Sequence, residues 1–249
     1  MKDDSVRSIE RAFFILKCFN LDTPRLTLTQ IAEQINLPTT TTLRILTTLV
    51  AVGLLTKTDG RYYKLGRESF LIGAIARAHF RPQHVAYPYM VEIRDDTNEA
   101  TSLYGIDGEC RVCYEHVPSL LSMRCVVRVG DCFPLWAGAG GKVLLAYESN
   151  EVIEREIAKA KKITDTTIID RELFLEELKK IRGMDYAISY GEREDGIISL
   201  AVPIFDMQGR APLCLSIAGP AARFTEETAT DIVPRLQSIC TEISRKIFV

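Results

Sequence analysis

The sequence predicts an α+β protein with a winged helix-turn-helix over residues 1–66, a linker helix over 67–81 and an α+β domain over 82–249. Three observations carry this prediction. Three short helical patterns precede residue 52. The Asp59-Gly60 pair then separates two short strand patterns, which is a strong hairpin signal. Beyond residue 98, strand patterns come first, amphipathic helices follow and further strands come last, which favours an α+β sheet over a doubly wound one.

The composition is that of an ordinary globular protein, with 47% hydrophobic and 26% charged residues in a chain of 249. No run approaches the roughly 18 consecutive apolar residues that a membrane span needs. The first residues, MKDDSVRSIERAFF, carry acids where a secretory signal has bases, so we expect a cytoplasmic protein with no membrane partner. Seven cysteines scattered through apolar sequence favour reduced thiols over a disulfide framework.

The charge is distributed unevenly, although the net charge is only −2. Residues 1–80 contain 11 basic and 7 acidic residues, whereas residues 81–249 contain 20 basic and 26 acidic residues. A basic segment joined to an acidic one favours a polyanionic partner for the first segment alone.

Two helical patterns open the chain. Residues 5–20 place apolar side chains at helical spacing, with Ser5 or Ser8 as the N-cap. A second pattern follows Thr27, and Gln30 three residues later gives the spacing of a capping box. Two short helices with a polar break between them predict a helix-turn-helix.

The third helical pattern, LPTTTTLRILTTL (37–49), is unusually rich in threonine. Its apolar stripe is expected to pack inward: Leu43, Ile45, Leu46, Leu49 and Val50. Its other face presents Thr40, Thr41, Arg44, Thr47 and Thr48, with Thr39 at the start. Short hydroxyl side chains and a helix N-terminus suit phosphate oxygens, and a threonine methyl can pack on the thymine methyl. We therefore expect this face to enter a DNA groove; the alternative is a solvent-exposed face with Thr39 as a simple cap.

The predicted hairpin over 53–66 forms the wing, and its basic residues are expected to reach phosphates. The predicted DNA-binding set is Thr39, Thr40, Thr41, Arg44, Thr48, Lys57, Arg61 and Lys64. The linker helix pattern, RESFLIGAIARAHF (67–80), has an apolar stripe too broad for an isolated helix. Since one recognition helix reads few bases, we expect at least a homodimer paired through residues 1–20 and 67–80, on an inverted-repeat operator in double-stranded DNA.

The C-terminal segment alternates between strand and helix patterns. The expected strands are 99–106, 109–117, 123–129 (MRCVVRV), 185–190, 196–205 and 211–219, and the expected helices are 83–95, a short one opening in GAGGKVLLAY, 151–162, 171–181 and 225–247. In the two late strands, large residues alternate with small ones, of which Ser199 and Ser216 are examples. A sheet with one bulky face and one small, weakly polar face can leave a cavity on the second face; alternatively, the small residues only seat a helix.

Cys110 and Cys113 form a CxxC motif, with His116, Cys125 and Cys132 nearby in sequence. This motif opens a rival interpretation, a metal or redox sensor or an enzyme built on the C-terminal domain. However, on a strand the two motif cysteines point to opposite faces, and no second CxxC pair exists. No G-x-S-x-G or H-E-x-x-H motif is present. We therefore expect no metal site, no cofactor and no catalytic residues.

Several stretches resemble the IclR family of bacterial transcriptional regulators over nearly the whole chain. They are VRSIERAFFIL, LTQIAEQINLPTTTTLRILTTLVAVGLL, YYKLG, VRVGDCFPLWAGAGGKVLLA and VPIFDMQGRAPLCLSIAGPAARFT. The resemblance implies a winged-helix DNA-binding domain, a linker helix, a GAF-like effector-binding domain, and dimers that often pair as dimers of dimers. The chain departs from the family pattern at Trp136, Ser189 and Ala218, which weakens the case for the usual small-carboxylate effectors.

The resemblance also implies an effector site, carried over position by position. Its residues are Ser122, Cys125, Trp136, Ala139, Gly140, Ser189, Ile197, Ser199, Ser216 and Ala218. The backbone amides at Ala139 and Gly140 are expected to take a carboxylate, because a helix start favours negative charge. Trp136 is expected to wall an aromatic or extended apolar ligand, or else to be plain core. We therefore expect a ligand-responsive regulator of a catabolic or metabolic operon whose effector is a small organic acid, aromatic or apolar rather than a hydroxy acid.

Overall fold

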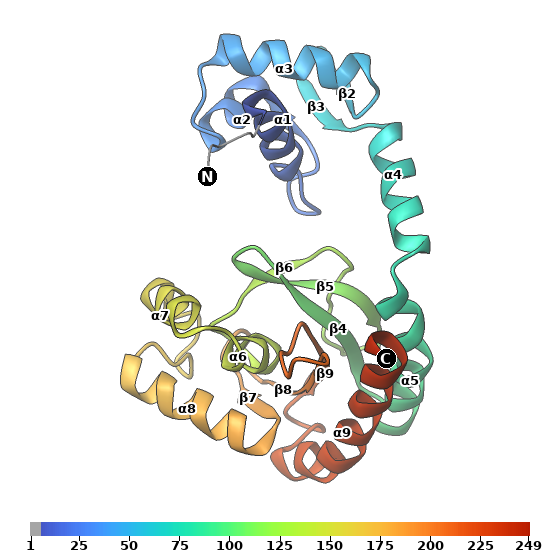
Figure 1. The fold of residues 1–249 in the computed structure, drawn as a ribbon, viewed down its shortest axis with the longest axis vertical. Helices are drawn as coiled ribbons and strands as arrows, with labels where there is room; N and C mark the ends of the chain where they lie inside the picture. The colour runs from blue at the N-terminus through green and yellow to red at the C-terminus, as the bar shows by residue number, and fades with distance from the viewer. Residues whose placement is uncertain (1–5) are drawn as a thin grey trace. The chain divides into compact units, whose positions relative to one another are not determined.

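The computed structural model describes residues 6–249, which divide after Phe80 into two compact units, the second being Arg81–Val249. We call them the N-terminal and C-terminal units and describe each separately (Figure 1). In the described residues, no helix is long and apolar enough to cross a membrane.

The N-terminal unit is a small helical bundle with a three-stranded antiparallel sheet in the order β1-β3-β2. Its elements are α1 (Arg7–Lys17), β1 (Leu26–Thr27), α2 (Leu28–Gln34), α3 (Thr39–Ala51), β2 (Leu55–Thr58), β3 (Tyr62–Leu65) and α4 (Arg67–Ala78). Its core gathers apolar side chains from α1, α2, α3 and the sheet. This arrangement confirms the predicted winged helix-turn-helix.

Local chemistry explains most of these boundaries. The Thr27 hydroxyl oxygen accepts a hydrogen bond from the backbone N–H of Gln30. The side-chain oxygen of Gln30 accepts one from the backbone N–H of Thr27, and the two bonds form the predicted capping box. The wing turn is a three-residue loop, 59–61, with positive φ at Asp59 (52°) and Gly60 (70°), a conformation that aspartate and glycine tolerate in hairpin turns. Both signals act over a few residues, so the sequence alone reveals them.

Two expectations about helix ends and faces are wrong, and the alternative role of Thr39 as a cap is also excluded. The N-cap of α1 is Val6, without a side-chain hydrogen bond; Ser8 lies inside the helix, and Ser5 lies outside the described residues. The N-cap of α3 is Pro38, so Thr39 is the first helical residue and not a cap. Leu43 is 43% exposed instead of packing inward, because the buried stripe of α3 consists of Thr42, Leu46 and Leu49.

The C-terminal unit contains a six-stranded antiparallel sheet in the order β6-β5-β4-β9-β8-β7. Its strands are β4 (Ala100–Asp107), β5 (Cys110–Val117), β6 (Cys132–Pro134), β7 (Ala187–Tyr190), β8 (Ile197–Ile204) and β9 (Leu213–Pro220). Its helices are α5 (Arg81–Thr97), α6 (Ala139–Ala146), α7 (Asn150–Lys159), α8 (Arg171–Met184) and α9 (Glu226–Phe248). Pro82 stands near the start of α5, where its missing N–H has no intrahelical partner to lose.

The two faces of this sheet are covered by different helices. The large residues of β8 and β9, such as Leu200 and Leu215, pack beneath α5 and α9, which lie side by side (Figure 1). On the other face, Ala201 and Cys214 pack with α6, α7 and α8. The register pairs Ser199 with Ala218, so the small residues share one face, as their alternation predicts.

The segment MRCVVRV (123–129) is not a strand, contrary to expectation. It belongs to a loop over 118–131 in which Cys125 and Val127 are buried but Met123 and Val126 are about 70% exposed. Buried and exposed residues therefore alternate in this segment as they would in a strand, but the segment pairs with no neighbouring strand. The sheet edge is formed instead by β6, which pairs with β5.

A disulfide joins Cys110 on β5 to Cys132 on β6, with the two Cα atoms 5.9 Å apart. The expectation of reduced thiols is therefore wrong for these two residues, which neighbouring strands bring together from 22 positions apart. The other five cysteines are free.

Candidate functional site

The first candidate surface is the polar face of α3. Thr39, Thr40, Arg44 and Thr48 are exposed, and Thr41 is half-buried. Helix geometry brings Thr40, Arg44 and Thr48 onto one side, since they are spaced by four residues; Thr41 lies three residues before Arg44, and Thr39 stands at the helix start. This face carries one cation and several hydroxyl groups, which is chemistry suited to a phosphate backbone and to base edges.

The threonine hydroxyls on this face are not equivalent. The hydroxyls of Thr47 and Thr48 donate within α3 to the carbonyls of Leu43 (2.9 Å) and Arg44 (3.2 Å). Those of Thr39 and Thr40 form no hydrogen bond with any described residue and lie beside the helix N-terminus. Donors for an incoming anion are therefore concentrated in the first turn of α3, whereas Thr48 offers mainly its methyl group and oxygen lone pairs.

A groove between α1 and α3 borders the same face, with a volume of about 540 Å³. Thr41, Arg44 and Thr48 line one side, and Ser8 and Arg11 of α1 line the other. Arg11 is therefore a second cation beside Arg44. Sequence reasoning missed it because helical periodicity says nothing of which turns of two different helices meet.

The wing separates its basic residues. Lys57 lies opposite Tyr63 in the ladder, and its ammonium lies 5.7 Å from that ring centroid. Lys64 lies opposite Thr56, and directly opposed residues share a sheet face, so Lys57 and Lys64 point to opposite faces. Arg61 is at the turn, with its guanidinium 4.9 Å from the ring centroid of Tyr62.

The second candidate site is a cavity on the small-residue face of the C-terminal sheet. It is about 30 Å³, room for about two water molecules. Strands β4, β5, β7, β8 and β9, the turn before α6, the 191–196 turn and the 118–131 loop all contribute. The lining residues are Ala100, Ser102, Tyr104, Arg111, His116, Cys125, Val127, Gly138, Ser189, Glu192, Arg193, Glu194, Ile197, Ser199, Ser216 and Ala218.

The structure brings together part of the predicted effector set. Cys125, Ser189, Ile197, Ser199, Ser216 and Ala218 line the cavity. The other four residues lie outside the lining. Ser122 is exposed in the 118–131 loop, and Trp136 packs in the apolar core beneath α6, α7 and α8. Ala139 and Gly140 are buried in the first turn of α6, and it is the preceding Gly138 that reaches the cavity.

Two amides of the glycine-rich turn already have acceptors. The Gly138 amide donates to Glu192 Oε2 (3.2 Å), and the Ala139 amide donates to Ser199 Oγ (3.4 Å). Glu192 is fixed in turn by Lys142, whose ammonium also bonds Glu177. Of the two amides expected to take a carboxylate, those of Ala139 and Gly140, the Ala139 amide is therefore already bonded to a hydroxyl, and the preceding Gly138 amide faces a carboxylate.

Two arginines at the cavity have no anionic partner. Arg111 is 4% exposed, and its guanidinium lies beside the rings of Tyr104 and Phe133, 4.7 and 5.2 Å from their centroids. Arg193 lies 4.1 Å from the Phe133 centroid. Arg111 Nε and Arg193 Nη1 are buried without a hydrogen-bond partner, and no carboxylate of the described residues pairs with either side chain. Burial lowers the pKa of Arg111 from its usual value.

His116 is a further cavity residue that the sequence did not identify. Its Nδ1 lies 2.9 Å from the Ser102 hydroxyl across the β4–β5 ladder. Burial lowers the pKa of this imidazole, although the nearby Glu115 and Asp131 carboxylates oppose the shift. A neutral imidazole can accept from one neighbour and donate to another, which suits the recognition of a polar ligand.

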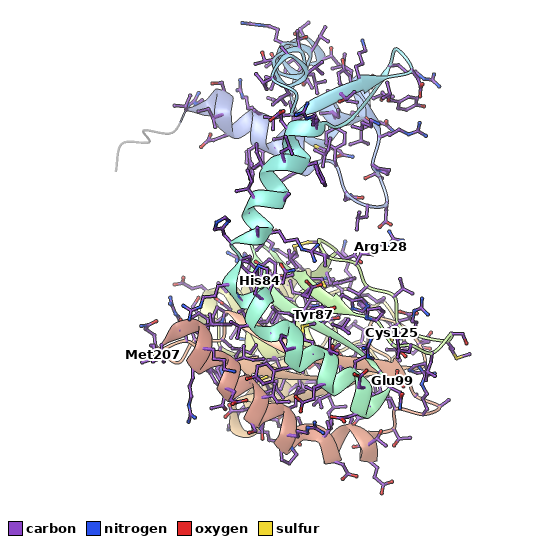
Figure 2. The ribbon with its side chains drawn as sticks, turned by 90° about the vertical axis from the view of Figure 1, so that its right-hand side faces the viewer. His84, Tyr87, Glu99, Cys125, Arg128 and Met207 are labelled. Carbon is purple, nitrogen blue, oxygen red and sulfur yellow. A yellow bond between two sulfur atoms is a disulfide. The ribbon has the colours of Figure 1, made fainter. Side chains whose placement is uncertain are left out.

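The 118–131 loop covers the cavity and is tied to the turn after β9. Arg223 pairs with Glu99 (Nε–Oε1, 2.5 Å) and donates to the Met123 carbonyl (2.7 Å). Figure 2 labels Glu99 at the start of the sheet and Cys125 on this loop. Most residues of this loop are exposed, so its outward movement would enlarge the cavity by breaking the Arg223 bond to Met123 and exposing the buried Cys125 and Val127.

Three free cysteines, Cys113, Cys125 and Cys214, are buried at or near the cavity. Burial is the main cause that raises the pKa of Cys113 and Cys214 to about 12 and that of Cys125 to about 11, so these thiols stay protonated at neutral pH. Among residues 6–249, no group of three or more His, Cys, Asp or Glu could hold a metal ion.

Comparisons with known proteins agree with this architecture. The family profile described as bacterial transcriptional regulator IclR C-terminal matches residues 76–245, and the IclR helix-turn-helix domain matches residues 8–59. The chain is similar to the HTH-type transcriptional regulator KipR of Bacillus subtilis, at 28% identity over 97% of each protein. It is also similar to the p-hydroxybenzoate hydroxylase transcriptional activator of Acinetobacter baylyi, at 29% identity over 97% of this chain and 92% of that protein. Its structure is similar to that of an IclR transcriptional regulator from Alicyclobacillus acidocaldarius, with a TM-score of 0.85 and 27% identity over 97% of this chain and 99% of that one.

Proposed function

Because this chain belongs to the IclR family of transcriptional regulators, we propose that it controls a catabolic or metabolic operon by binding an operator through α3 and a small organic acid through the C-terminal cavity. Its matched relatives are transcriptional regulators and not enzymes. In this proposal residues 1–66 bind DNA, 67–81 link, and 82–249 sense the effector.

The single observation that carries the DNA proposal is the exposed polar face of α3. Its first turn offers the free hydroxyls of Thr39 and Thr40 together with unpaired backbone amides. Arg44 lies one to two turns further along, where a guanidinium can reach a guanine edge in the major groove. Arg11 from α1 then contacts phosphate beside it, and the wing contributes a further phosphate contact through Arg61 or Lys64.

The effector proposal is supported by the chemistry of the cavity. Its lining combines the small side chains of Ser199, Ser216 and Ala218 with cationic and aromatic groups. A carboxylate suits the cations, and the ring of Tyr104 suits an aromatic or apolar body. The relative from Acinetobacter is named for a p-hydroxybenzoate hydroxylase, which agrees with an aromatic acid. Since the closed cavity holds about two water molecules, such a ligand enters by displacing the 118–131 loop.

The proposed functional assembly is a homodimer on an inverted repeat, with pairing of two dimers as the larger form. The support is the surface of α4, on which no residue is buried and where Phe70, Ile72 and Ile75 are more than half exposed. An apolar face of this kind on a soluble protein marks an interaction site. A second copy of the same helix would cover it with matching chemistry.

The test is fluorescence anisotropy of the full chain on DNA from upstream of its own gene, with and without a panel of carboxylic acids. We expect a dissociation constant of about 10 nM or lower at physiological salt, with an affinity that at least one acid changes. Scrambled DNA of the same length is the control. Equal affinity for both duplexes would contradict a specific regulator, and operator binding that no acid alters would contradict the effector part alone.

A further inference from the structure

We infer that the ligand of the C-terminal cavity is a small dicarboxylic acid, with one carboxylate on Arg111 and the other on Arg193. This inference rests on the proposed function and makes it more specific. It names the two guanidinium groups, and not the glycine-rich turn, as the anion-binding groups of the site.

Arg111 provides the inner position. It projects from β5, and its guanidinium is held by stacking against Tyr104 and Phe133, without an ion pair or hydrogen bond to any described residue. A buried cation without an anion is costly, and stacking on rings compensates only part of the lost hydration. The side chain is thus poised to receive a carboxylate, whose two oxygens match the guanidinium fork.

Arg193 provides the outer position. It belongs to the 191–196 turn between β7 and β8, and it is half-buried where Arg111 is buried. Both guanidinium groups contact the same ring, Phe133, so they are neighbours of equal charge. Two like charges at one cavity repel each other, and an anion between or beside them removes that repulsion.

The acids of the cavity lining do not supply this anion. Glu192 is already engaged by Lys142 and the Gly138 amide. Glu194 is exposed to solvent and forms no ion pair with either arginine. A monocarboxylate would neutralise only one guanidinium and leave its neighbour unpaired, whereas a dicarboxylate satisfies both.

The arrangement favours two carboxylates over one phosphate. A phosphate is best bound where several donors converge, as at a helix start, but the amides of Gly138 and Ala139 are taken up by Glu192 and Ser199. The two free guanidinium groups differ in depth, and this suits two separate acidic groups on one short molecule.

Isothermal titration of the full chain with matched acids tests the inference. The pairs are phthalate against benzoate and succinate against butyrate, so each pair differs by one carboxylate. We expect at least one dicarboxylate to bind about tenfold or more tightly than its monocarboxylate partner. Equal binding within both pairs, tighter binding of inorganic phosphate, or no dicarboxylate binding at millimolar concentration would each overturn the inference.

Variants then assign the residues. Arg111→Met and Arg193→Met keep much of the apolar stem but remove the charge, and each should abolish the preference for the second carboxylate. Arg171→Met, which breaks a surface ion pair with Glu154, is the matched control and should leave the preference unchanged. If Arg111→Met fails to fold, the result for Arg193→Met decides the test alone. Arg193→Met that still binds the dicarboxylate more tightly than its monocarboxylate partner overturns the inference.

Operator binding measured without any acid distinguishes a failure of the proposed function from a failure of the dicarboxylate inference. A chain that binds its operator but shows no dicarboxylate preference retains the proposed function and loses only this inference. A chain that prefers dicarboxylates but ignores its operator retains the inference about the cavity and loses the proposed function.

Discussion

The Lys142 ammonium lies 2.5 Å from Glu192 Oε1 in the interior of the C-terminal unit, and the other oxygen of Glu192 accepts the Gly138 amide hydrogen. The side chains of Lys142 and Glu192 are 1% and 6% exposed. This pair joins α6 to the 191–196 turn, which also carries Arg193. It therefore sets the position of one wall of the cavity.

Replacing Lys142 with methionine should lower the free energy of unfolding by about 3–5 kcal/mol, because it leaves the Glu192 carboxylate buried without its cation. Urea denaturation of the two proteins measures the difference. Lys162→Met is the control, since Lys162 pairs with Asp165 at the surface, where solvent screens the pair, and the change should have little effect on stability. A loss below about 1 kcal/mol in Lys142→Met would show that the pair is not needed for stability.

Replacing Arg44 with alanine should cost about 1–3 kcal/mol of operator affinity and relax specificity at one base pair. Anisotropy titrations against operators with single base changes measure both quantities. Arg44→Lys is the informative partner variant, because it keeps the charge but loses the bidentate geometry. It should keep non-specific affinity while losing base discrimination. Unchanged operator binding in Arg44→Ala would sink the assignment of α3 as the base-reading helix.

The two wing lysines should differ, because they lie on opposite faces of the hairpin. Lys57 stacks on Tyr63, so we expect Lys64 to make the phosphate contact. Lys64→Gln should therefore reduce the slope of log affinity against log salt by about 0.9, and Lys57→Gln should leave it nearly unchanged. The reverse result would mean that the other face of the wing meets the DNA.

The pH dependence of stability should report on His116. Its pKa is below the ordinary 6.5 in the folded chain, mainly through burial, so the unfolded chain binds more protons as pH falls below that value. The contribution of neutral His116 to the free energy of unfolding is complete above about pH 6.5 and is lost as the pH falls through the folded pKa. The free energy of unfolding then changes by at most about 1.4 kcal/mol per pH unit. His116→Gln should flatten the pH profile of the melting temperature. The control, His79→Gln at the end of α4, should leave it unchanged, and an unchanged profile in His116→Gln would contradict the assignment.

Charge on the apolar face of α4 should disrupt the proposed dimer. Ile75→Glu should raise the dimer dissociation constant about tenfold or more, because the carboxylate would be buried against the second copy. Sedimentation velocity over a concentration series measures this constant. Gly73→Glu, at an exposed position about 160° around the helix from Ile75, should have little effect. Equal dissociation constants for the wild-type chain and Ile75→Glu would place the interface elsewhere.

The sequence by itself determined the features whose causes are local. The capping box at Thr27, the Asp59-Gly60 turn and the helical spacing of α3 act over a few residues, so they fixed the winged helix-turn-helix and its polar face. The alternation of large and small residues in β8 and β9 likewise determined which sheet face has room for a cavity.

Only the tertiary structure decided which side chains meet there. Arg111, His116 and Arg193 stand on β5 and a distant turn, and strand order brings them to Ser199 and Ser216. The same pairing of neighbouring strands joined Cys110 to Cys132 and left 123–129 as a loop. The physical reason is that periodicity determines the face on which a residue lies, whereas its neighbours depend on register and on contacts between segments far apart in the chain.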